Sequence, residues 1–220
     1  MPCIDSQRRG RGLLLMGTAR FWCVGLLFGL LLLSGCSKAP LPPLPSDGVI
    51  LAFGDSLTAG VGAGPAQDYP SELARLTGLA VVNAGVSGEL AQQGRLRLPE
   101  ALARHRPDLL VLLMGGNDIL RNRPEAAIKA DLAAMIEQAR GTGVPVLLVG
   151  VPSKRILLRT SPIYRELADQ YGDGVVLVED PLTELLRSPS HKSDAVHLNA
   201  DGYRRLAQAL HQRLIETGAL

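Results

Sequence analysis

Five short apolar runs, separated by segments with helical periodicity, constrain the fold of this 220-residue chain more than any other feature. The runs are rich in Val and Leu and lack the alternation of a half-exposed strand, so they predict strands covered on both faces. They occupy residues 49–53, 79–83, 109–114, 144–149 and 175–178, and the amphipathic segments occupy residues 70–77, 89–104, 124–140, 162–171 and 200–216. Repeated strand–helix units predict a single α/β domain of three layers, with about five parallel strands between helices.

The amino-terminal segment, residues 1–35, has the pattern of an export signal. Four arginines precede an apolar stretch at residues 21–33, which is shorter than the about 20 residues of a bilayer-spanning helix. The stretch ends in LSGC at residues 33–36, which resembles the lipobox of bacterial lipoproteins. We therefore expect cleavage before Cys36, lipidation of Cys36, and anchoring to a bacterial membrane on its periplasmic or external side. The alternative, a buried core helix, fits less well because no polar face accompanies the leucines.

Removal of residues 1–35 changes the charge balance and the cysteine count. The whole chain has 23 Lys and Arg and 21 Asp and Glu; the removed segment holds four arginines and one aspartate, which leaves 19 basic and 20 acidic side chains. A nearly neutral domain does not predict a nucleic-acid partner. Of three cysteines only Cys36 remains, so we expect a domain without disulfides whose stability comes from its core.

Residues 36–48 connect the expected lipid site to the first strand. Four prolines in this stretch favour an extended, semi-rigid spacer. A proline-rich recognition motif is the alternative, but it fits a linker position less well. We expect the spacer to hold the domain, residues 49–220, away from the membrane.

Three short sequences carry the chemistry: GDSL at residues 54–57, GGND at residues 115–118 and DAVH at residues 194–197. The first places the hydroxyl of Ser56 just after an apolar run, where a strand would end. The last supplies the imidazole of His197, with the carboxylate of Asp194 three residues before it. A serine hydroxyl becomes a good nucleophile when a base takes its proton and a third group orients that base. The three residue types together therefore predict a serine esterase.

Four sequence blocks resemble those of the GDSL, or SGNH, hydrolases, a family named after Ser, Gly, Asn and His. The matching residues are Ser56, Gly88, Asn117, and Asp194 with His197. The residues around Gly88 and Asn117 resemble the bacterial thioesterase I, lysophospholipase and arylesterase subgroup in particular, and the resemblance covers about residues 49–214. It implies the flavodoxin-like SGNH hydrolase fold. One departure is Leu198, because the family commonly has Pro directly after the catalytic histidine.

The predicted architecture brings these blocks to one place. In open α/β sheets the loops at the carboxyl ends of the strands form the site. Ser56 follows the first apolar run, Gly88 the second and Asn117 the third. The loop with Asp194 and His197 comes after the fifth run and before the last amphipathic segment. We therefore expect all four blocks to meet at one rim of the sheet.

Each matching residue has an expected role. Ser56 attacks an acyl carbonyl, His197 takes the hydroxyl proton and returns it to the leaving group, and Asp194 bonds the other imidazole nitrogen. The negative charge on the carbonyl oxygen would be met by the backbone N–H groups of Ser56 and Gly88 and by the side-chain amide of Asn117. The chain has no metal-binding sequence pattern, so we expect no metal and no cofactor.

Each assignment also has a structural alternative. Ser56 is a good N-cap residue for a following helix, and Asn117 stands in a sequence of turn composition. His191, six residues before His197, is an alternative base, although it lacks an aspartate three positions before it. Asp55 is expected to shape its turn through side-chain to backbone hydrogen bonding, and Asp118 is expected to have a supporting role.

The resemblance implies broad hydrolysis of acyl esters and thioesters, including aryl esters and lysophospholipids. Apolar residues at 119–120 and 156–158 would line an acyl groove, and Arg121, Arg123 and Arg155 would meet a polar or anionic head group. Two alternatives remain open here: a carbohydrate O-acetylesterase of the cell envelope, and a lipoprotein binding module that has lost turnover. We expect the protein to act as a monomer.

Overall fold

The computed structural model describes residues 41–154 and 158–220. The expected export signal and the expected lipidation site at Cys36 lie outside the described residues, as do Arg155 and two residues of the expected acyl groove, Ile156 and Leu157. The longest helices in the described part have 17 residues each. None of the described helices combines the length and the hydropathy that crossing a membrane requires.

Five parallel strands form the sheet, as the apolar runs predict, and their ends differ from the expected ones by at most two residues. They are β1 (Val49–Gly54), β2 (Ala80–Gly85), β3 (Leu109–Leu113), β4 (Val146–Val149) and β5 (Val175–Val178). Hydrogen-bonded neighbours follow the order β2-β1-β3-β4-β5, and every pair is parallel. This is the order of flavodoxin-like sheets, in which the direction of winding reverses between β1 and β3.

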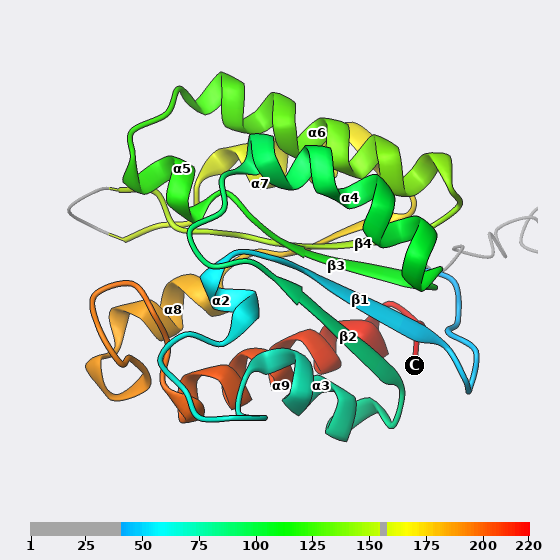
Figure 1. Cartoon of the computed structure of the whole chain (residues 1–220), viewed down its shortest axis with the longest axis horizontal. Helices are drawn as coiled ribbons and strands as arrows, with labels where there is room; N and C mark the ends of the chain where they lie inside the picture. The colour runs from blue at the N-terminus through cyan, green and yellow to red at the C-terminus, as the bar shows by residue number, and fades with distance from the viewer. Residues whose placement is uncertain (1–40, 155–157) are drawn as a thin grey trace, which may run out of the picture. The chain divides into compact units, whose positions relative to one another are not determined.

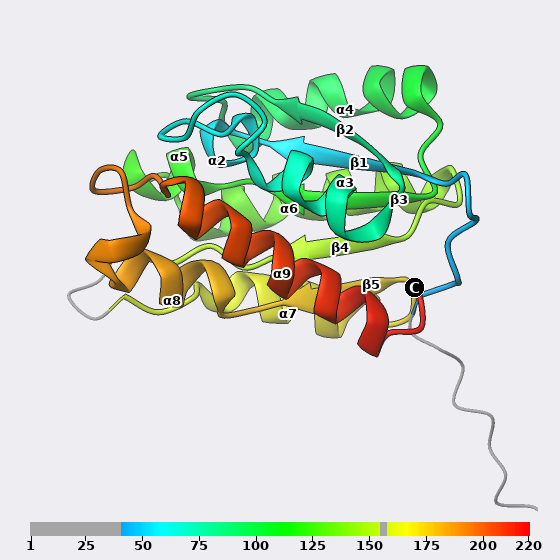
Figure 2. The ribbon, with the colours of Figure 1, turned by 90° about the horizontal axis from the view of Figure 1, so that it is seen from below.

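Helices cover both faces of the sheet, so the three-layer prediction is confirmed (Figure 1). One face carries α4 (Ala91–His105), α6 (Glu125–Gly141) and α7 (Pro162–Tyr171). The other carries α3 (Tyr69–Thr77), α8 (Pro181–Arg187) and α9 (Ala200–Glu216). Figure 2 looks onto this second face and shows α9 lying beside α3 and across the strands. The five amphipathic segments thus form the five long helices.

Three short helices were not predicted: α2 (Ser56–Ala59), α5 (Gly116–Leu120) and α8. The first two are one turn each, too short for a hydrophobic period to be visible. Helix α8 does have a start signal in the sequence, because Pro181 stands at its first position directly after Asp180. A short 3₁₀ turn, Pro189–His191, precedes the histidine loop.

Burial distinguishes the edge strand β2 from the other strands. Every residue of β3 and β4 is buried, as is all of β1 after its first residue. Strand β2 is only half-buried and exposes Ala80 and Asn83. The expectation that all five strands are covered on both faces is therefore wrong for β2, which forms one edge of the sheet. The core lies between the central strands and the two helix layers.

Residues 41–48, expected as part of an extended, semi-rigid spacer, contact the domain. Leu41 is fully buried in the core. The N–H of Leu44 donates to the carbonyl of Ala219 at 2.8 Å, and the N–H of Gly48 donates to the carbonyl of Pro45 at 2.9 Å. Leu41 and Leu44, which stand between the prolines, pack on the domain. The folded part of the chain therefore begins before Val49, the expected domain start.

Candidate active site

The four sequence blocks meet at the carboxyl ends of the strands, as predicted. Ser56 begins α2 directly after β1, Gly88 lies in the loop after β2, and Asn117 lies in α5 after β3. The loop with His197 lies between the 3₁₀ turn and α9 and reaches the same end of the sheet, on the left of Figure 1. Ligands of open α/β sheets bind where the strand order reverses, here between β1 and β3. Ser56 and Asn117 flank that point.

The turn from β1 into α2 fixes the position of Ser56. Asp55 is the N-cap residue, and its Oδ1 accepts from the N–H of Leu57 at 3.1 Å. A Cβ on Gly54 would overlap the carbonyl of Leu113 and the side chain of Thr58, so only glycine permits this close approach of β1, β3 and α2. The alternative that Ser56 caps the helix is wrong. The Ser56 hydroxyl makes no hydrogen bond within α2 and contacts His197 instead.

The loop of Asp194 and His197 is organised by the aspartate itself. Asp194 Oδ1 accepts from the N–H groups of Val196 and His197, both at 2.8 Å. Leu198, where the family commonly has Pro, is fully buried and pairs with Lys192 in an antiparallel bridge. The loop is thus held by its own hydrogen bonds and by a buried leucine, which replaces the stiffness that a proline would give.

Ser56, His197 and Asp194 form one chain of hydrogen bonds. Ser56 Oγ lies 3.0 Å from His197 Nε2, and His197 Nδ1 lies 2.7 Å from Asp194 Oδ2. The hydrogen bond from His197, together with the two backbone donors, lowers the pKa of Asp194 to about 2. The carboxylate is therefore ionised at neutral pH and only accepts, so the imidazole proton lies on Nδ1 and Nε2 accepts from the serine hydroxyl.

His191, the alternative base, does not reach Ser56. Its Nδ1 lies 2.8 Å from Asp201 Oδ2, at the start of α9. The histidine that contacts Ser56 is His197, as the position of Asp194 in the sequence predicted.

Two backbone N–H groups and one side-chain amide are the expected donors to the oxyanion. Among residues 41–154 and 158–220, neither Ser56 N–H nor Gly88 N–H has a hydrogen-bond acceptor. Gly88 has a φ of +79°, and a Cβ there would meet no protein atom within 4 Å. Glycine is therefore favoured at this position by the left-handed backbone and not by crowding within the protein. Asn117 Nδ2 donates to the carbonyl of Glu89 at 3.1 Å and lies 3.4 Å from Asp55 Oδ2.

Asp55 is a buried acid next to the serine. It is 3% exposed, and burial raises its pKa from the ordinary 3.8 to about 6, against the lowering effect of the Leu57 N–H and of His197. Asp118 and Glu89, both acidic, raise it further. The carboxylate therefore changes charge near neutral pH, in contrast to Asp194. Its expected turn-shaping role is confirmed by the bond to Leu57.

The remaining acidic groups near the serine are bound by arginines and backbone amides. Asp118 is fully buried, accepts from the N–H of Ala91 at 2.9 Å and pairs with Arg123, which also pairs with Asp131. Arg123 was expected to meet a substrate head group; that expectation is wrong, because its guanidinium points to these two carboxylates. No group of three or more His, Cys, Asp and Glu side chains in the described part of the chain is placed to hold a metal ion.

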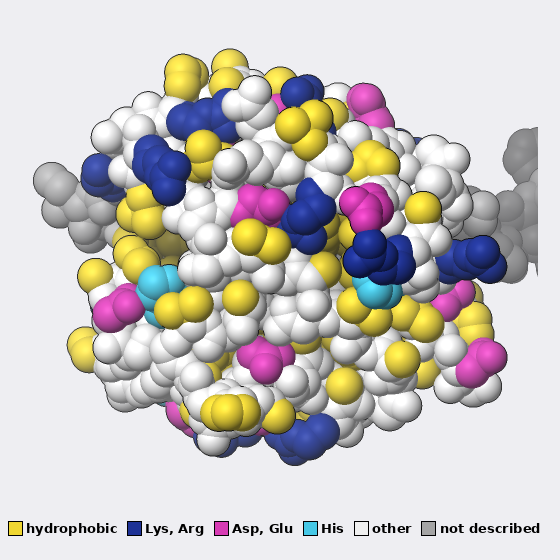
Figure 3. All heavy atoms as spheres, in the orientation of Figure 1, with side chains coloured by type: hydrophobic (Ala, Val, Ile, Leu, Met, Phe, Trp, Pro, Cys, Tyr) yellow, Lys and Arg dark blue, Asp and Glu magenta, His cyan; other side chains and the backbone are white. Residues whose placement is uncertain are grey.

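Ser56, Asn117 and His197 line one pocket of about 300 Å³. Most of its remaining lining is apolar and includes Ile119, Leu120, Val151, Leu158, Leu186 and Val196. In the space-filling view of Figure 3, hydrophobic side chains gather around a hollow at this end of the molecule. Lys154 and Lys192 also line the pocket. The sequence predicted arginines near the site and gave no signal for these lysines, which come from two loops far apart in the chain.

The fold and the site together define a class of protein. A flavodoxin-like sheet with a Ser–His–Asp chain at its reversal point, and without a Gly-x-Ser-x-Gly sequence around the serine, is a serine hydrolase outside the ordinary α/β-hydrolase type. The comparison with protein families agrees: the GDSL-like Lipase/Acylhydrolase family matches residues 52–205. The chain belongs to this family.

Known relatives agree with this assignment. Esterase TesA of Pseudomonas aeruginosa is 37% identical over 127 residues, which cover 55% of this chain and 63% of that relative. Thioesterase 1/protease 1/lysophospholipase L1 of Escherichia coli K12 is 28% identical over 173 residues, which cover 75% of this chain and 82% of the relative. A crystal structure of TesA is similar with a TM-score of 0.67 and 29% identity, over 77% of this chain and 99% of that one.

The raised pKa of Asp55 predicts a pH-dependent stability. In the native state Asp55 keeps its proton up to a pH of about 6, whereas in the unfolded chain it loses it near 3.8. The stability from this group is therefore greatest below about pH 4 and falls as the pH rises through about 6. Asp55→Asn removes the cost of the buried charge. We expect it to raise the free energy of unfolding at pH 8 by up to about 3 kcal/mol and to change it little at pH 4.

Urea unfolding of the two proteins at both pH values measures this effect. Asp173→Asn, in the exposed turn after α7, is the matched control, and its effect should be the same at the two pH values. Equal stability of wild type and Asp55→Asn at pH 8 would contradict the assignment of a buried charge to Asp55.

Proposed function

We propose that this protein hydrolyses carboxylic esters and thioesters through a covalent acyl-enzyme, with Ser56, His197 and Asp194 as the catalytic residues. The observation that carries the proposal is the hydrogen-bond chain of 3.0 Å from Ser56 Oγ to His197 Nε2 and 2.7 Å from His197 Nδ1 to Asp194 Oδ2. An ionised aspartate fixes the imidazole tautomer in which Nε2 accepts a proton. An activated serine needs a hydroxyl, a base that takes its proton and a group that orients the base, and these three residues supply them.

The geometry supports the following sequence of steps. The oxygen of Ser56 bonds to the acyl carbon while its proton moves to His197 Nε2. The carbonyl oxygen becomes an anion, and the C=O bond re-forms as the alcohol or thiol leaves with the proton from His197. Water then attacks the acyl-serine in the same way, its proton moves to Nε2, and Ser56 leaves with that proton while the carboxylic acid is released.

Three donors would hold the anion that forms in both steps. Ser56 N–H and Gly88 N–H have no acceptor among the described residues, so each is available. Asn117 Nδ2 uses one of its two hydrogens for the carbonyl of Glu89. The other makes only the long contact of 3.4 Å with Asp55 and would be shared with the substrate oxygen. Each donor of this kind contributes about 10²- to 10³-fold to the rate.

The pocket favours an acyl group longer than acetyl. Its lining is mainly aliphatic, and each buried methylene contributes about 0.8 kcal/mol, or about fourfold in the rate constant kcat/KM. Lys154 and Lys192 add positive charge to the same pocket, which suits an anionic or polar leaving group. Relatives named as an esterase and as a thioesterase and lysophospholipase support the same range of substrates.

We further propose that the enzyme is exported and bound to a membrane through Cys36. The support is the sequence pattern of residues 1–36. Because Leu41 is buried in the domain, at most four residues, 37–40, would lie between the lipid and the first described contact with the domain. Cys36→Ser should abolish the incorporation of labelled palmitate into the protein in cells, whereas wild type should be labelled. Labelling of Cys36→Ser equal to that of wild type would contradict the proposal.

Replacement of the catalytic residues tests the mechanism. Ser56→Ala should lower hydrolysis of p-nitrophenyl butyrate by about 10⁴-fold or more, and Asp194→Asn by about 10²- to 10⁴-fold, because the imidazole tautomer is no longer fixed. Both proteins should keep the wild-type circular dichroism spectrum. A serine-directed phosphonate should add to wild type at Ser56, as mass spectrometry of the peptides would show, and should not add to Ser56→Ala. Wild-type activity equal to that of Ser56→Ala would instead identify a binding module.

Acyl-chain preference tests the proposed substrate class. We expect kcat/KM to rise by about tenfold or more from the acetyl to the butyryl ester. Leu120→Ala should lower kcat/KM for the octanoyl ester by about fivefold and leave the acetyl ester within about twofold. Leu96→Ala, which removes a leucine that is 73% exposed on α4, should change neither. A preference for acetylated sugars over all longer acyl esters would favour the carbohydrate O-acetylesterase.

A further inference from the structure

The side-chain amide of Asn117 is oriented by one carbonyl group. Its Nδ2 donates to the carbonyl of Glu89 at 3.1 Å, and its contact with Asp55 is long, at 3.4 Å. The two hydrogens of an amide nitrogen lie in one plane at a fixed angle. The position of the Glu89 carbonyl therefore decides where the second hydrogen of Asn117 points.

The loop that carries this carbonyl has few backbone hydrogen bonds of its own. It follows β2, contains the left-handed Gly88, and is closed by a turn in which Glu89 N–H donates to the carbonyl of Val86 at 3.2 Å. Val86 itself is 42% exposed, and Ser87 is exposed. The N–H of Leu90, which belongs to the same peptide unit as the Glu89 carbonyl, donates to Gln93 Oε1 at 3.0 Å. This bond holds the peptide from the side of α4, and a second contact on Glu89 itself is needed if the Asn117 amide is to keep one direction.

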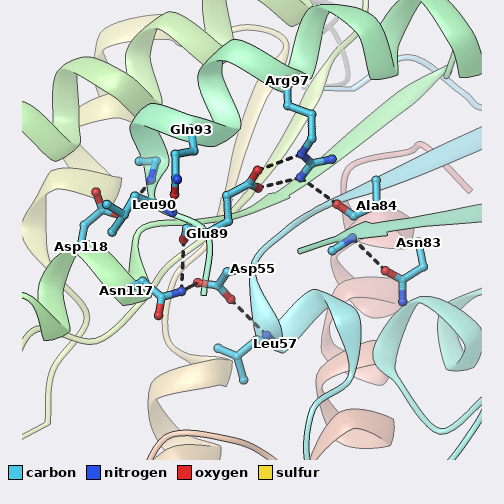
Figure 4. A network of polar contacts seen from close by, with 12 residues as sticks. Asp55, Leu57, Asn83, Ala84, Glu89, Leu90, Gln93, Arg97, Asn117 and Asp118 are labelled. Carbon is cyan, nitrogen blue, oxygen red and sulfur yellow. Dashed lines mark hydrogen bonds and ion pairs between the residues drawn. The ribbon is translucent and has the colours of Figure 1, made fainter. Parts of the chain in front are cut away.

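The Glu89 side chain supplies that fixation through Arg97 of α4. Glu89 is only 7% exposed although it is charged. Arg97 Nε donates to Glu89 Oε1 at 2.9 Å, and Arg97 Nη2 donates to Glu89 Oε2 at 2.7 Å, so the contact has two prongs. Figure 4 shows the carboxylate of Glu89 turned toward Arg97 and its carbonyl turned toward Asn117, on opposite sides of the same residue.

Arg97 is in turn fixed to the sheet. Its Nη2 also donates to the carbonyl of Ala84 in β2 at 3.1 Å, and its guanidinium lies over the ring of Phe53 in β1, 4.0 Å from the ring centroid. The arginine thus connects α4, β1, β2 and the Glu89 loop. A planar guanidinium can make a two-pronged contact and stack on an aromatic ring at the same time, which a lysine cannot.

We propose that Glu89 and Arg97 are positioning residues that hold the Glu89 carbonyl and thereby aim the amide of Asn117 at the substrate oxygen. A buried ion pair contributes little net free energy to folding, because the desolvation of both charges offsets their attraction. Its geometry is definite, however, and a shift of one carbonyl would misdirect a donor to the developing oxyanion. The inference rests on the proposed esterase function and names residues that touch neither the nucleophile nor the base.

The Glu89–Arg97 ion pair is the clamp. The first test compares two variants of the clamp with a matched control on α4. Glu89→Gln removes the charge, and Arg97→Lys keeps the charge but loses the second prong. Glu100→Gln alters an exposed pair with Arg104, whose side chains are 72% and 66% exposed. Active sites are counted with a serine-directed phosphonate, so that kcat refers to folded, competent enzyme. We expect both clamp variants to lower kcat for p-nitrophenyl butyrate by about tenfold or more, with KM within about threefold, and Glu100→Gln to stay within about twofold.

A transition-state analogue separates aiming from general stability. Phenylboronic acid forms a tetrahedral adduct with an active serine, and its inhibition constant should rise in Glu89→Gln by the same factor as kcat falls. A clamp that only stabilises the fold would lower the melting temperature while kcat per active site and the inhibition constant stay unchanged. That result would overturn the inference. If Glu89→Gln does not fold, Arg97→Lys decides the question by the same measurements.

A double-mutant cycle tests whether the effect passes through Asn117. In the background of Asn117→Ala there is no amide to aim, so Glu89→Gln should lower kcat there by a factor at least about threefold smaller than in wild type. The same factor in both backgrounds would overturn the inference. Failure of the proposed function is distinguishable, because in that case wild type itself would show no hydrolysis that depends on Ser56.

Discussion

The hydrogen bond between Ser56 and His197 joins residues 141 positions apart in the chain, and the rest of the site depends on it. A bond this distant in sequence can be short only if the sheet topology brings the two loops together. The reversal of strand order between β1 and β3 does this, because it opens a space at the carboxyl end of β1. The loop before α9 fills one side of that space, and Tyr203 of α9 fixes the opposite loop by donating to the carbonyl of Val61 at 2.7 Å.

Two aspartates near the serine have opposite electrostatic surroundings. Asp194 is about half-exposed and accepts three hydrogen bonds, from its own loop and from His197, which keep it ionised. Asp55 is buried among other acids, and its raised pKa reflects the cost of holding a charge there. The ionised aspartate orients the histidine, and the buried one caps α2 and lies beside Asn117. The difference follows from exposure and from the number of hydrogen bonds that each carboxylate accepts.

The fold could be predicted because hydrophobic period and strand–helix alternation are local signals. The same holds for Ser56, Asn117 and His197, since each stands at a fixed offset from a strand or within a short sequence block. The packing of Leu41 was missed because a proline-rich stretch hides the apolar residues between its prolines. Arg123 was assigned to the substrate wrongly, because sequence alone does not say that its guanidinium turns toward Asp118 and Asp131. The Glu89–Arg97 pair was also missed, since it joins a loop to a helix across a turn whose geometry only the folded structure fixes.

The central claim is that Ser56 and His197 act as one unit. The most direct test is a double-mutant cycle in kcat with Ser56→Ala, His197→Ala and the combined variant. If His197 takes the proton of Ser56 as Ser56 attacks the substrate, the loss of either residue removes the same step. The combined variant should then be no slower than the slower single variant, within about threefold. Independent losses that multiply in the combined variant would show that the imidazole does not serve the serine hydroxyl, and would contradict this account.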